Sequence, residues 1–413
     1  MKMLIKEPKV VRINESVRIS AKIVLSELYN KRKYPQELWY EFPAEYECYI
    51  TRHSNAFVTA LLFLAMRHND KVEVEGVLSV KFFNGVNKAK DIFIKWWPHW
   101  FGETEIIPQK LTTERIKNHP QEVGCCFSGG VDSFYSLYRH FGEREPDSRA
   151  RVSHGLFALI GPPFSWKKPE LYNRYFKKNK IELEKFGINL TSAKSNVFDF
   201  LREWDWLYGH GPATISTVLL LEKFFSRFLI PSSFQQGQWL SFKIGTNIET
   251  DYLFSTENIE FAHDGFEASR AEKTFAISGW EATYPLLNVC LGRTDDMQNC
   301  GKCFKCMRTM IFLELKNKLY KYQMFPKTLN FSDIRKWDLP DEFLRSLAEG
   351  VLEEAVRHKR DDIAECLRIA LKRSKSTPIK IGRYFQKTLG VIKKAFNQCK
   401  LWTIRLRKIV LRF

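Results

Sequence analysis

The 413-residue chain is poor in cysteine and has no long hydrophobic run. It contains 9 cysteines and begins Met-Lys-Met-Leu-Ile-Lys, without the apolar core of a secretory signal peptide. Both features argue against a disulfide framework and predict a cytoplasmic location. The apolar stretch 56–66 is too short for a membrane span, which takes about 20 residues. With no internal repeat or low-complexity block, the length predicts two or three domains with hydrophobic cores.

Acidic residues are missing from the C-terminal segment. Residues 371–413 contain 13 Lys or Arg and no Asp or Glu, which is most of the formal net charge of +18. Apolar residues recur among these bases, a pattern that favours an anionic partner such as a nucleic acid or a membrane surface. The alternative is a terminal helix with one solvated basic face. Pro378, Gly382 and Gly390 predict an interrupted helix, so we expect a basic amphipathic tail at 377–413.

Short apolar runs alternate with longer amphipathic stretches from residue 123 onward. The expected strands are 123–127, 156–160, 188–192, 228–233 and 286–290, and the expected helices include 169–186 and 212–225. This alternation predicts an α/β fold, with a parallel sheet that has helices on both faces. Ligands of such sheets bind beyond the carboxyl ends of the strands.

The segment Ser128-Gly129-Gly130-Val131-Asp132-Ser133 follows the first of these strands and leads into an expected helix. Adjacent glycines let the backbone turn tightly and present N–H groups to an anion, and the serines add hydroxyl donors at a helix N-terminus. We therefore predict that this loop binds the phosphates of ATP, with Asp132 holding Mg²⁺ or a polar atom beside the pyrophosphate. The alternative is an ordinary turn, since Ser, Gly and Asp are common in turns and helix caps.

Four cysteines, Cys290, Cys300, Cys303 and Cys306, form a second group. Their spacing suits one tetrahedral Zn²⁺, because a Cys-x2-Cys turn places two sulfurs on one metal and Gly301 allows the chain to fold back. Four protein ligands leave no open position for chemistry, so we expect a structural zinc. An iron–sulfur cluster is the alternative, since four cysteines hold either.

The Ser-Gly-Gly-Val-Asp-Ser loop resembles the PP-loop of the ATP pyrophosphatase superfamily. Together with the cysteine pattern, it makes roughly residues 122–315 similar to the 7-cyano-7-deazaguanine synthase family. The resemblance implies an adenine nucleotide alpha hydrolase-like fold, and it implies that Ser128, Gly129, Gly130, Asp132 and Ser133 bind ATP while the four cysteines bind zinc. Enzymes of this family adenylate a carboxylate and capture ammonia. Nine residues rather than the family's eight separate the first two cysteines, and the family's Ser-Gly-Tyr-Pro-Asp-Cys-Arg substrate segment is missing.

Four further polar residues are candidates for catalysis or substrate binding. His210 lies in the segment 208–211 before an expected helix, where it could contact phosphate or act as a general acid; a polar loop residue is the alternative. Asp264, Arg270 and Lys273 lie where the family has its substrate segment. They could orient an acidic acceptor and neutralise charge during adenylation. The alternative for this group is a solvated helix face.

The motifs divide the chain into four expected segments. Residues 1–115 carry no motif and are expected to form an accessory α+β domain, and residues 116–330 form the ATP-binding domain with its zinc loop. A helical extension is expected at 331–376, before the basic tail at 377–413.

Three classes of function follow. The first is an AMP-forming carbon–nitrogen ligase that adenylates a small acid, deazapurine-like or other, and captures ammonia or another amine. The second is a tRNA- or other nucleic-acid-modifying enzyme, which the basic tail favours; Cys125 and Cys126 read as core residues rather than as a thiolase pair. The third is a nucleotide-dependent module that modifies a protein or glycan in a defence or surface-glycan pathway. Association with a membrane surface through the tail is a further expectation.

Overall fold

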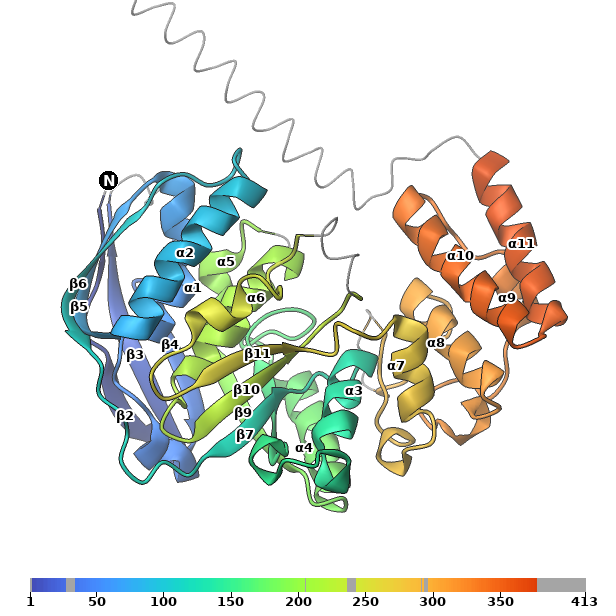
Figure 1. Ribbon diagram of the computed structural model, residues 1–413, viewed down its shortest axis with the longest axis horizontal. Coiled ribbons are helices and arrows are strands. Elements are labelled where there is room, and N and C mark those ends of the chain that lie inside the picture. Colours follow the sequence, from blue (N-terminus) through green and yellow to red (C-terminus); the bar gives the residue numbers. More distant parts are fainter. Residues whose placement is uncertain are drawn as a thin grey trace, which may run out of the picture. The chain divides into compact units, whose positions relative to one another are not determined.

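The structure is a computed structural model that describes residues 2–26, 34–204, 206–235, 243–290, 292 and 296–376 (Figure 1). The chain forms two compact units. One contains Met1–Asn299 and Tyr320–Phe325, and the other contains Cys300–Leu319 and the chain from Pro326 onward. The expected basic tail, 377–413, lies outside the described residues. Among the helices that the structure describes, none has the length and apolar character needed to cross a membrane.

The first unit contains strands and helices in alternation, as the sequence predicts from residue 123 onward. Its strands are β1 (Lys2–Ile5), β2 (Lys9–Ile13), β3 (Ser16–Leu25), β4 (Glu37–Pro43), β5 (Lys71–Ser79), β6 (Glu105–Thr112), β7 (Glu122–Cys126), β8 (His154–Leu159), β9 (Asn189–Ser195), β10 (Phe225–Pro231) and β11 (Glu260–Asp264). Its α-helices are α1 (Asn55–His68), α2 (Val80–Trp96), α3 (Val131–His140), α4 (Glu170–Glu184), α5 (Phe198–Leu201), α6 (Trp206–Leu219) and α7 (Arg270–Ile277). The 3₁₀ helix η5 spans Asp251–Phe254.

Eleven strands of the described chain form one mixed, largely parallel sheet. Its order is β11-β10-β7-β8-β9-β4-β3-β1-β5-β6, and β2 pairs with β3. Strands β7 to β11 run parallel to one another, as do β1, β5 and β6. Strand β4 joins the two groups by pairing antiparallel with β9, where Tyr40 lies opposite Ser195. The segment expected as an accessory domain, 1–115, therefore contributes β1 to β6 to the same sheet as the segment that follows it.

The order of the parallel strands reverses between β7 and β10. From β7 the chain proceeds to β8 and β9 on one side, and it then returns to place β10 and β11 on the other side. Open α/β sheets bind ligands in the crevice at such a point, beyond the carboxyl ends of the strands. The loop Ser128–Ser133 follows β7, and Ser232 follows β10, so both lie at this place in the sheet.

Burial explains why α1 is helical without a polar face. Every residue from Asn55 to Met66 is buried, so this helix lies inside the molecule rather than on its surface. It packs against α6 and β5. Helix α2 begins at a conventional cap, where the Ser79 hydroxyl accepts the N–H of Phe82 at 3.0 Å.

Four of the five expected strands are confirmed as β7, β8, β9 and β10, but the strand expected at 286–290 is wrong. The N–H groups of that segment bond to a loop and a side chain instead of to a strand: Asn288 N–H donates to the Gly129 carbonyl, and Cys290 N–H donates to Asn299 Oδ1. The fifth parallel strand is β11, which the sequence analysis missed because Glu-Phe-Ala-His-Asp has no β-branched residue.

The second unit is helical in its described part. Its helices are α8 (Phe304–Leu315), α9 (Phe331–Arg335), α10 (Glu342–Arg357) and α11 (Asp361–Ser376). Helix α10 packs against α8 and α11, and α11 packs against α9. Residues 331–376, expected as a helical extension, thus contain three helices that share a core with α8.

Candidate phosphate-binding and metal sites

The Ser128–Ser133 loop has the backbone shape that the sequence predicts. Gly129 has φ +74°, a left-handed conformation that favours glycine, and Gly130 is the N-cap of α3. The Ser133 hydroxyl donates to the Gly130 carbonyl at 3.0 Å, and the Gly130 N–H lies 3.4 Å from Ser128 Oγ. The loop is also held from outside, because Asn288 N–H donates to the Gly129 carbonyl at 2.8 Å. It forms a turn at the N-terminus of a ten-residue helix.

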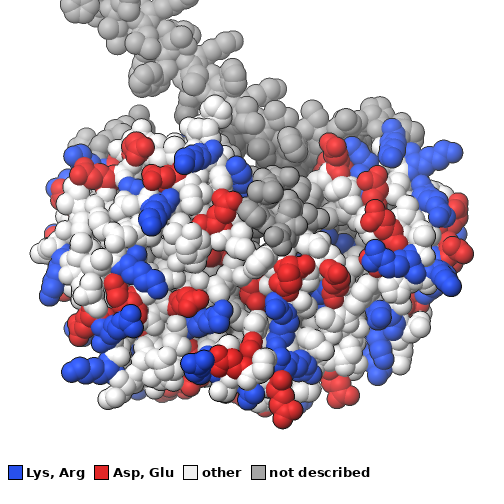
Figure 2. Space-filling model, in the orientation of Figure 1, with Lys and Arg blue, Asp and Glu red and all other residues white. Residues whose placement is uncertain are grey.

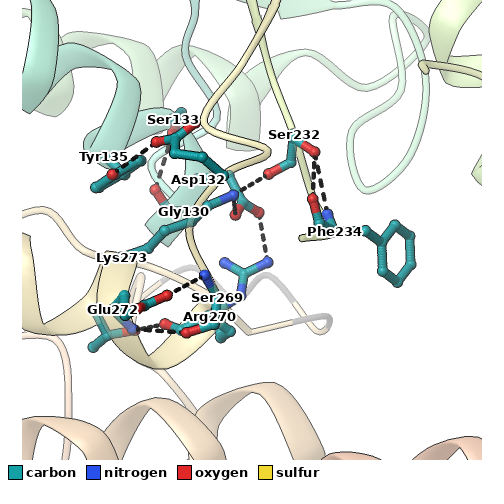
Figure 3. Close-up of polar contacts among 12 residues, drawn as sticks. Gly130, Asp132, Ser133, Tyr135, Ser232, Phe234, Ser269, Arg270, Glu272 and Lys273 are labelled. Carbon is teal, nitrogen blue, oxygen red and sulfur yellow. Dashed lines mark hydrogen bonds and ion pairs between the residues drawn. The ribbon is translucent and has the colours of Figure 1, made fainter. Parts of the chain in front are cut away.

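Two cations from α7 converge on this loop (Figure 3). Helix α7 begins with a capping box in which Ser269 and Glu272 exchange hydrogen bonds, at 3.2 and 2.7 Å. The box leaves Arg270 and Lys273, three residues apart, on one face of the helix. Arg270 lies 2.6 Å from Asp132 Oδ2 and Lys273 Nζ lies 3.5 Å from Asp132 Oδ1. The solvated-face alternative is therefore wrong for these two side chains.

Lys273 also connects the loop to β10. Its Nζ donates to the Ser232 carbonyl at 2.7 Å, and the residue is only 2% exposed. Burial lowers the pKa of Lys273, while the nearby Asp132 carboxylate opposes that change. A buried amine, an arginine and a helix N-terminus therefore meet where the strand order reverses. Such an arrangement can bind an anion with several oxygens.

The structure gives Asp264 a different set of partners. Asp264 lies at the end of β11, where its Oδ1 is 2.8 Å from His140 Nε2 and 3.4 Å from Arg139 of α3. Burial raises the pKa of Asp264, but the hydrogen bond and charge of His140 outweigh it, so the pKa is lowered. Burial likewise lowers the pKa of His140, and Asp264 and Glu145 outweigh it, so that pKa is raised. Asp264 belongs to an ion network between β11 and α3, whereas Arg270 and Lys273 contact Asp132.

His210 does not precede a helix, as the sequence predicted, but lies inside α6. Its Nδ1 is 3.0 Å from the Trp206 carbonyl and its Nε2 is 3.2 Å from Thr246 Oγ1. Burial lowers the pKa of His210. The neighbouring glycines suggested a loop, but Gly211 allows close packing inside the helix. A Cβ at Gly211 would lie 1.7 Å from the Gly245 carbonyl oxygen. His210 therefore occupies a packed helix and not an anion-binding helix end.

Three of the four predicted cysteine ligands surround the start of α8. Cys303 is the N-cap of α8, and Gly301, with φ +70°, turns the chain between Cys300 and Cys303. Cys306 Sγ lies 3.4 Å from Cys303 Sγ and 3.9 Å from Cys300 Sγ. The N–H of Cys303 lies 3.3 Å from Cys300 Sγ.

The Sγ atoms of Cys290, Cys300, Cys303 and Cys306 all lie within 4.8 Å of one another. Four sulfurs bound to one zinc ion at about 2.3 Å would lie about 3.8 Å apart. The observed spacings are of this size, so the cluster can hold a metal ion such as zinc.

Asn299 is a buried positioning residue that the sequence analysis missed. Its Oδ1 accepts the N–H groups of Val289 and Cys290, at 2.8 and 3.0 Å. Its Nδ2 donates to the carbonyls of Leu287 and Met324, at 2.9 and 3.0 Å. One side chain thus fixes the backbone on which Cys290 lies. Its place directly before Cys300 is the only signal that the sequence offers.

A scan against protein-family models and searches of curated proteins and of solved structures found no match to this chain.

Proposed function

We propose that this protein is an ATP-dependent, AMP-forming ligase that activates a small acid as an acyl adenylate and transfers the acyl group to ammonia or another amine. The observation that carries the proposal is the contact of Arg270 and Lys273 with Asp132, at the start of a helix beyond the reversal of strand order. Phosphates have oxygens for both the cations and the backbone N–H groups of such a place.

In the first step, an oxygen of the acid attacks the α-phosphorus of ATP and pyrophosphate leaves. Arg270 and Lys273 would balance the negative charge that grows on the pyrophosphate, and the Gly129–Gly130 turn would supply N–H donors. Asp132 would hold the two cations in place before nucleotide binds, and its carboxylate suits Mg²⁺, which proteins bind through one or two carboxylates together with substrate phosphates. In the second step, the amine forms a bond to the acyl carbon and AMP leaves.

The four cysteines would hold a structural zinc, because four protein ligands complete its coordination. Asn288 and Cys290 are close in sequence, and the Asn288 N–H donates to the Gly129 carbonyl. The role of the metal would be to fix the segment that holds the phosphate loop from outside.

The proposal is tested by incubating the purified protein with ATP, Mg²⁺, ammonium chloride and 7-carboxy-7-deazaguanine. AMP and the mass of the acid are followed together by chromatography and mass spectrometry. The expected result is AMP that depends on the acid, with conversion of the acid to the amide or nitrile. Zinc-loaded protein that makes no AMP with this acid or with a panel of other small acids would contradict the proposal.

The basic composition of residues 371–413 favours an alternative in which the acceptor is a nucleic acid. Adding tRNA to the same assay tests it, since AMP would then depend on the tRNA and a nucleoside would change mass. A thiolase is disfavoured, because burial raises the pKa of both Cys125 and Cys126 and so disfavours their thiolates.

A further inference from the structure

A histidine–aspartate pair lies at the carboxyl end of β11, outside the set of residues used above. His263 Nδ1 is 2.8 Å from Asp251 Oδ2, and Asp251 lies at the start of η5. The Asp251 side chain is 1% exposed, and its Oδ1 accepts the N–H of Asn247 at 2.9 Å. A carboxylate so fixed keeps the proton of a neutral imidazole on Nδ1 and leaves Nε2 as a base.

The other nitrogen of His263 has no hydrogen-bond partner among the described residues. The His263 side chain is 7% exposed, and Nε2 is not one of the fully buried side-chain atoms that lack a partner in the described part of the chain. This nitrogen therefore keeps accessible surface, where a ligand can donate a proton to it.

His263 belongs to the same edge of the sheet as the phosphate loop. It pairs with Ile230 of β10, two residues before Ser232, whose carbonyl accepts from Lys273. Adjacent strand residues point to opposite faces of a sheet. Asp264 contacts α3, whereas His263 contacts η5, so His263 faces the side of the sheet opposite to α3.

Contacts and electrostatic effects identify several neighbours of His263 and Asp251. His210 of α6 is close enough for both Asp251 and His263 to affect its pKa, and Asp251 also acts on the Cys126 thiol of β7. Phe266 stacks on the His263 ring, with centroids 6.4 Å apart. These contacts place a second histidine, a thiol and an aromatic ring around the pair.

We propose that His263, oriented by Asp251, is the general base that accepts a proton from the attacking amine. The inference rests on the proposed function and assigns its second step. As the amine nitrogen forms its bond to the acyl carbon, the bond from that carbon to the AMP oxygen breaks and AMP takes the electron pair. One proton passes from the amine nitrogen to His263 Nε2. The phosphate loop and the base would then act from two sides of the same strand ends.

The chain offers a matched control pair. His53 Nδ1 lies 2.6 Å from Glu222 Oε1, and the Glu222 side chain is fully buried. Glu222 precedes β10, so this pair belongs to the amino end of the strand whose carboxyl end carries Ser232. Replacing His53 removes a histidine–carboxylate contact of the same type without touching the candidate site.

The experiment compares the wild type with His263→Gln, Asp251→Asn and His53→Gln, after each is shown to be folded by its thermal midpoint. Acid-dependent exchange of pyrophosphate into ATP, with 7-carboxy-7-deazaguanine and no amine, reports adenylation alone. Single-turnover amide formation with ammonium chloride reports the second step. In His263→Gln we expect exchange to stay within about twofold of wild type and amide formation to fall about 10²- to 10⁴-fold.

Asp251→Asn should likewise keep pyrophosphate exchange and lose amide formation. This second variant keeps the inference testable if His263→Gln does not fold. Hydroxylamine, whose nitrogen is largely unprotonated at neutral pH, should restore acyl transfer in His263→Gln. Equal loss of exchange and amide formation, or no loss beyond that of His53→Gln, would overturn the inference and leave the proposed function standing. Wild-type protein that shows no exchange with 7-carboxy-7-deazaguanine or with any acid of the panel would overturn the proposed function, and this assignment with it.

Discussion

Asp132 is the residue on which the candidate phosphate site depends, because a single carboxylate holds both cations of α7. Replacing Asp132 with Asn removes the charge but keeps the shape. We expect AMP formation to fall at least about 100-fold while the fold is kept, since the loss concerns electrostatic stabilisation of the reaction. The measurement is acid-dependent AMP production, with Asp147→Asn, which affects an exposed pair with Arg149, as the control. Unchanged turnover would remove the loop from the mechanism.

The pair of His140 and Asp264 predicts a pH dependence of stability. The pKa of His140 is raised above its ordinary 6.5, so its stabilising contribution is complete below that value and is lost as the pH rises through the folded-state pKa. The pKa of Asp264 is lowered below its ordinary 3.8, so its contribution is present above that value and is lost as the pH falls through the folded-state pKa. The pair therefore stabilises the fold most between these two ordinary values.

His140→Asn should consequently lower the free energy of unfolding more at about pH 5.5 than at about pH 8.5. Urea denaturation at both pH values measures the difference, and Arg139 and Glu145, which also surround His140, stay in place in both proteins. An equal loss at the two pH values would mean that His140 acts through packing alone.

At the scale of elements, the cysteine segment makes the clearest prediction. Replacing Cys303, the N-cap of α8, with Ser should remove one metal ligand from the cluster. We expect the zinc content to fall and the free energy of unfolding to decrease by more than about 3 kcal/mol. Loss of a metal is among the most destabilising changes. Metal analysis and thermal unfolding measure both, with Cys48→Ser, at an exposed cysteine, as the control. A stable variant that keeps its zinc would contradict a structural metal.

The elements that could be predicted are those in which local sequence and tertiary packing agree. Strands β7, β8 and β10 contain short apolar runs in a largely parallel sheet, and such runs are recognisable without a structure. The Ser128–Ser133 loop was recognisable because a tight turn needs Gly129 at positive φ. The cysteine spacing was sufficient because ligands on one short turn must lie close together.

The elements that could not be predicted depend on distant contacts. The segment 286–290 has the apolar sequence of a strand, but the N–H groups of Val289 and Cys290 donate to the Asn299 side chain. The glycines of 208–211 look like a loop, but Gly211 instead lets α6 pass against Gly245. The pairing of His263 with Asp251 links two segments that carry no shared motif. In each case the deciding partner is identified only once the chain is folded.

Across the whole molecule, charge is unevenly distributed along the sequence. On the face shown in Figure 2, basic and acidic side chains are interspersed over the described residues, whereas residues 371–413 carry 13 of the positive charges and no negative one. A polyanion should therefore bind mainly through the C-terminal segment.

Removing residues 377–413 should lower the salt concentration at which the protein elutes from heparin, because fewer counterions are released on binding. ATP turnover should be unchanged, since the candidate sites lie elsewhere in the sequence. Heparin chromatography of the full and shortened chains measures the first outcome, and the AMP assay serves as the control. Identical elution would place the polyanion-binding charge among the remaining residues.

The antiparallel contact of β4 with β9 also sets an order of events during synthesis. One edge of β4 stays unpaired until β9 has been synthesised, because Tyr40 lies opposite Ser195 in the folded sheet. At roughly 5–20 residues per second, the ribosome takes about 8–30 s to make the chain between them. During that time β3 and β4 can pair with each other while the outer edge of β4 still offers unpaired N–H and C=O groups. The nascent protein is thus most open to mispairing before the Ser128–Ser133 loop has a completed sheet behind it.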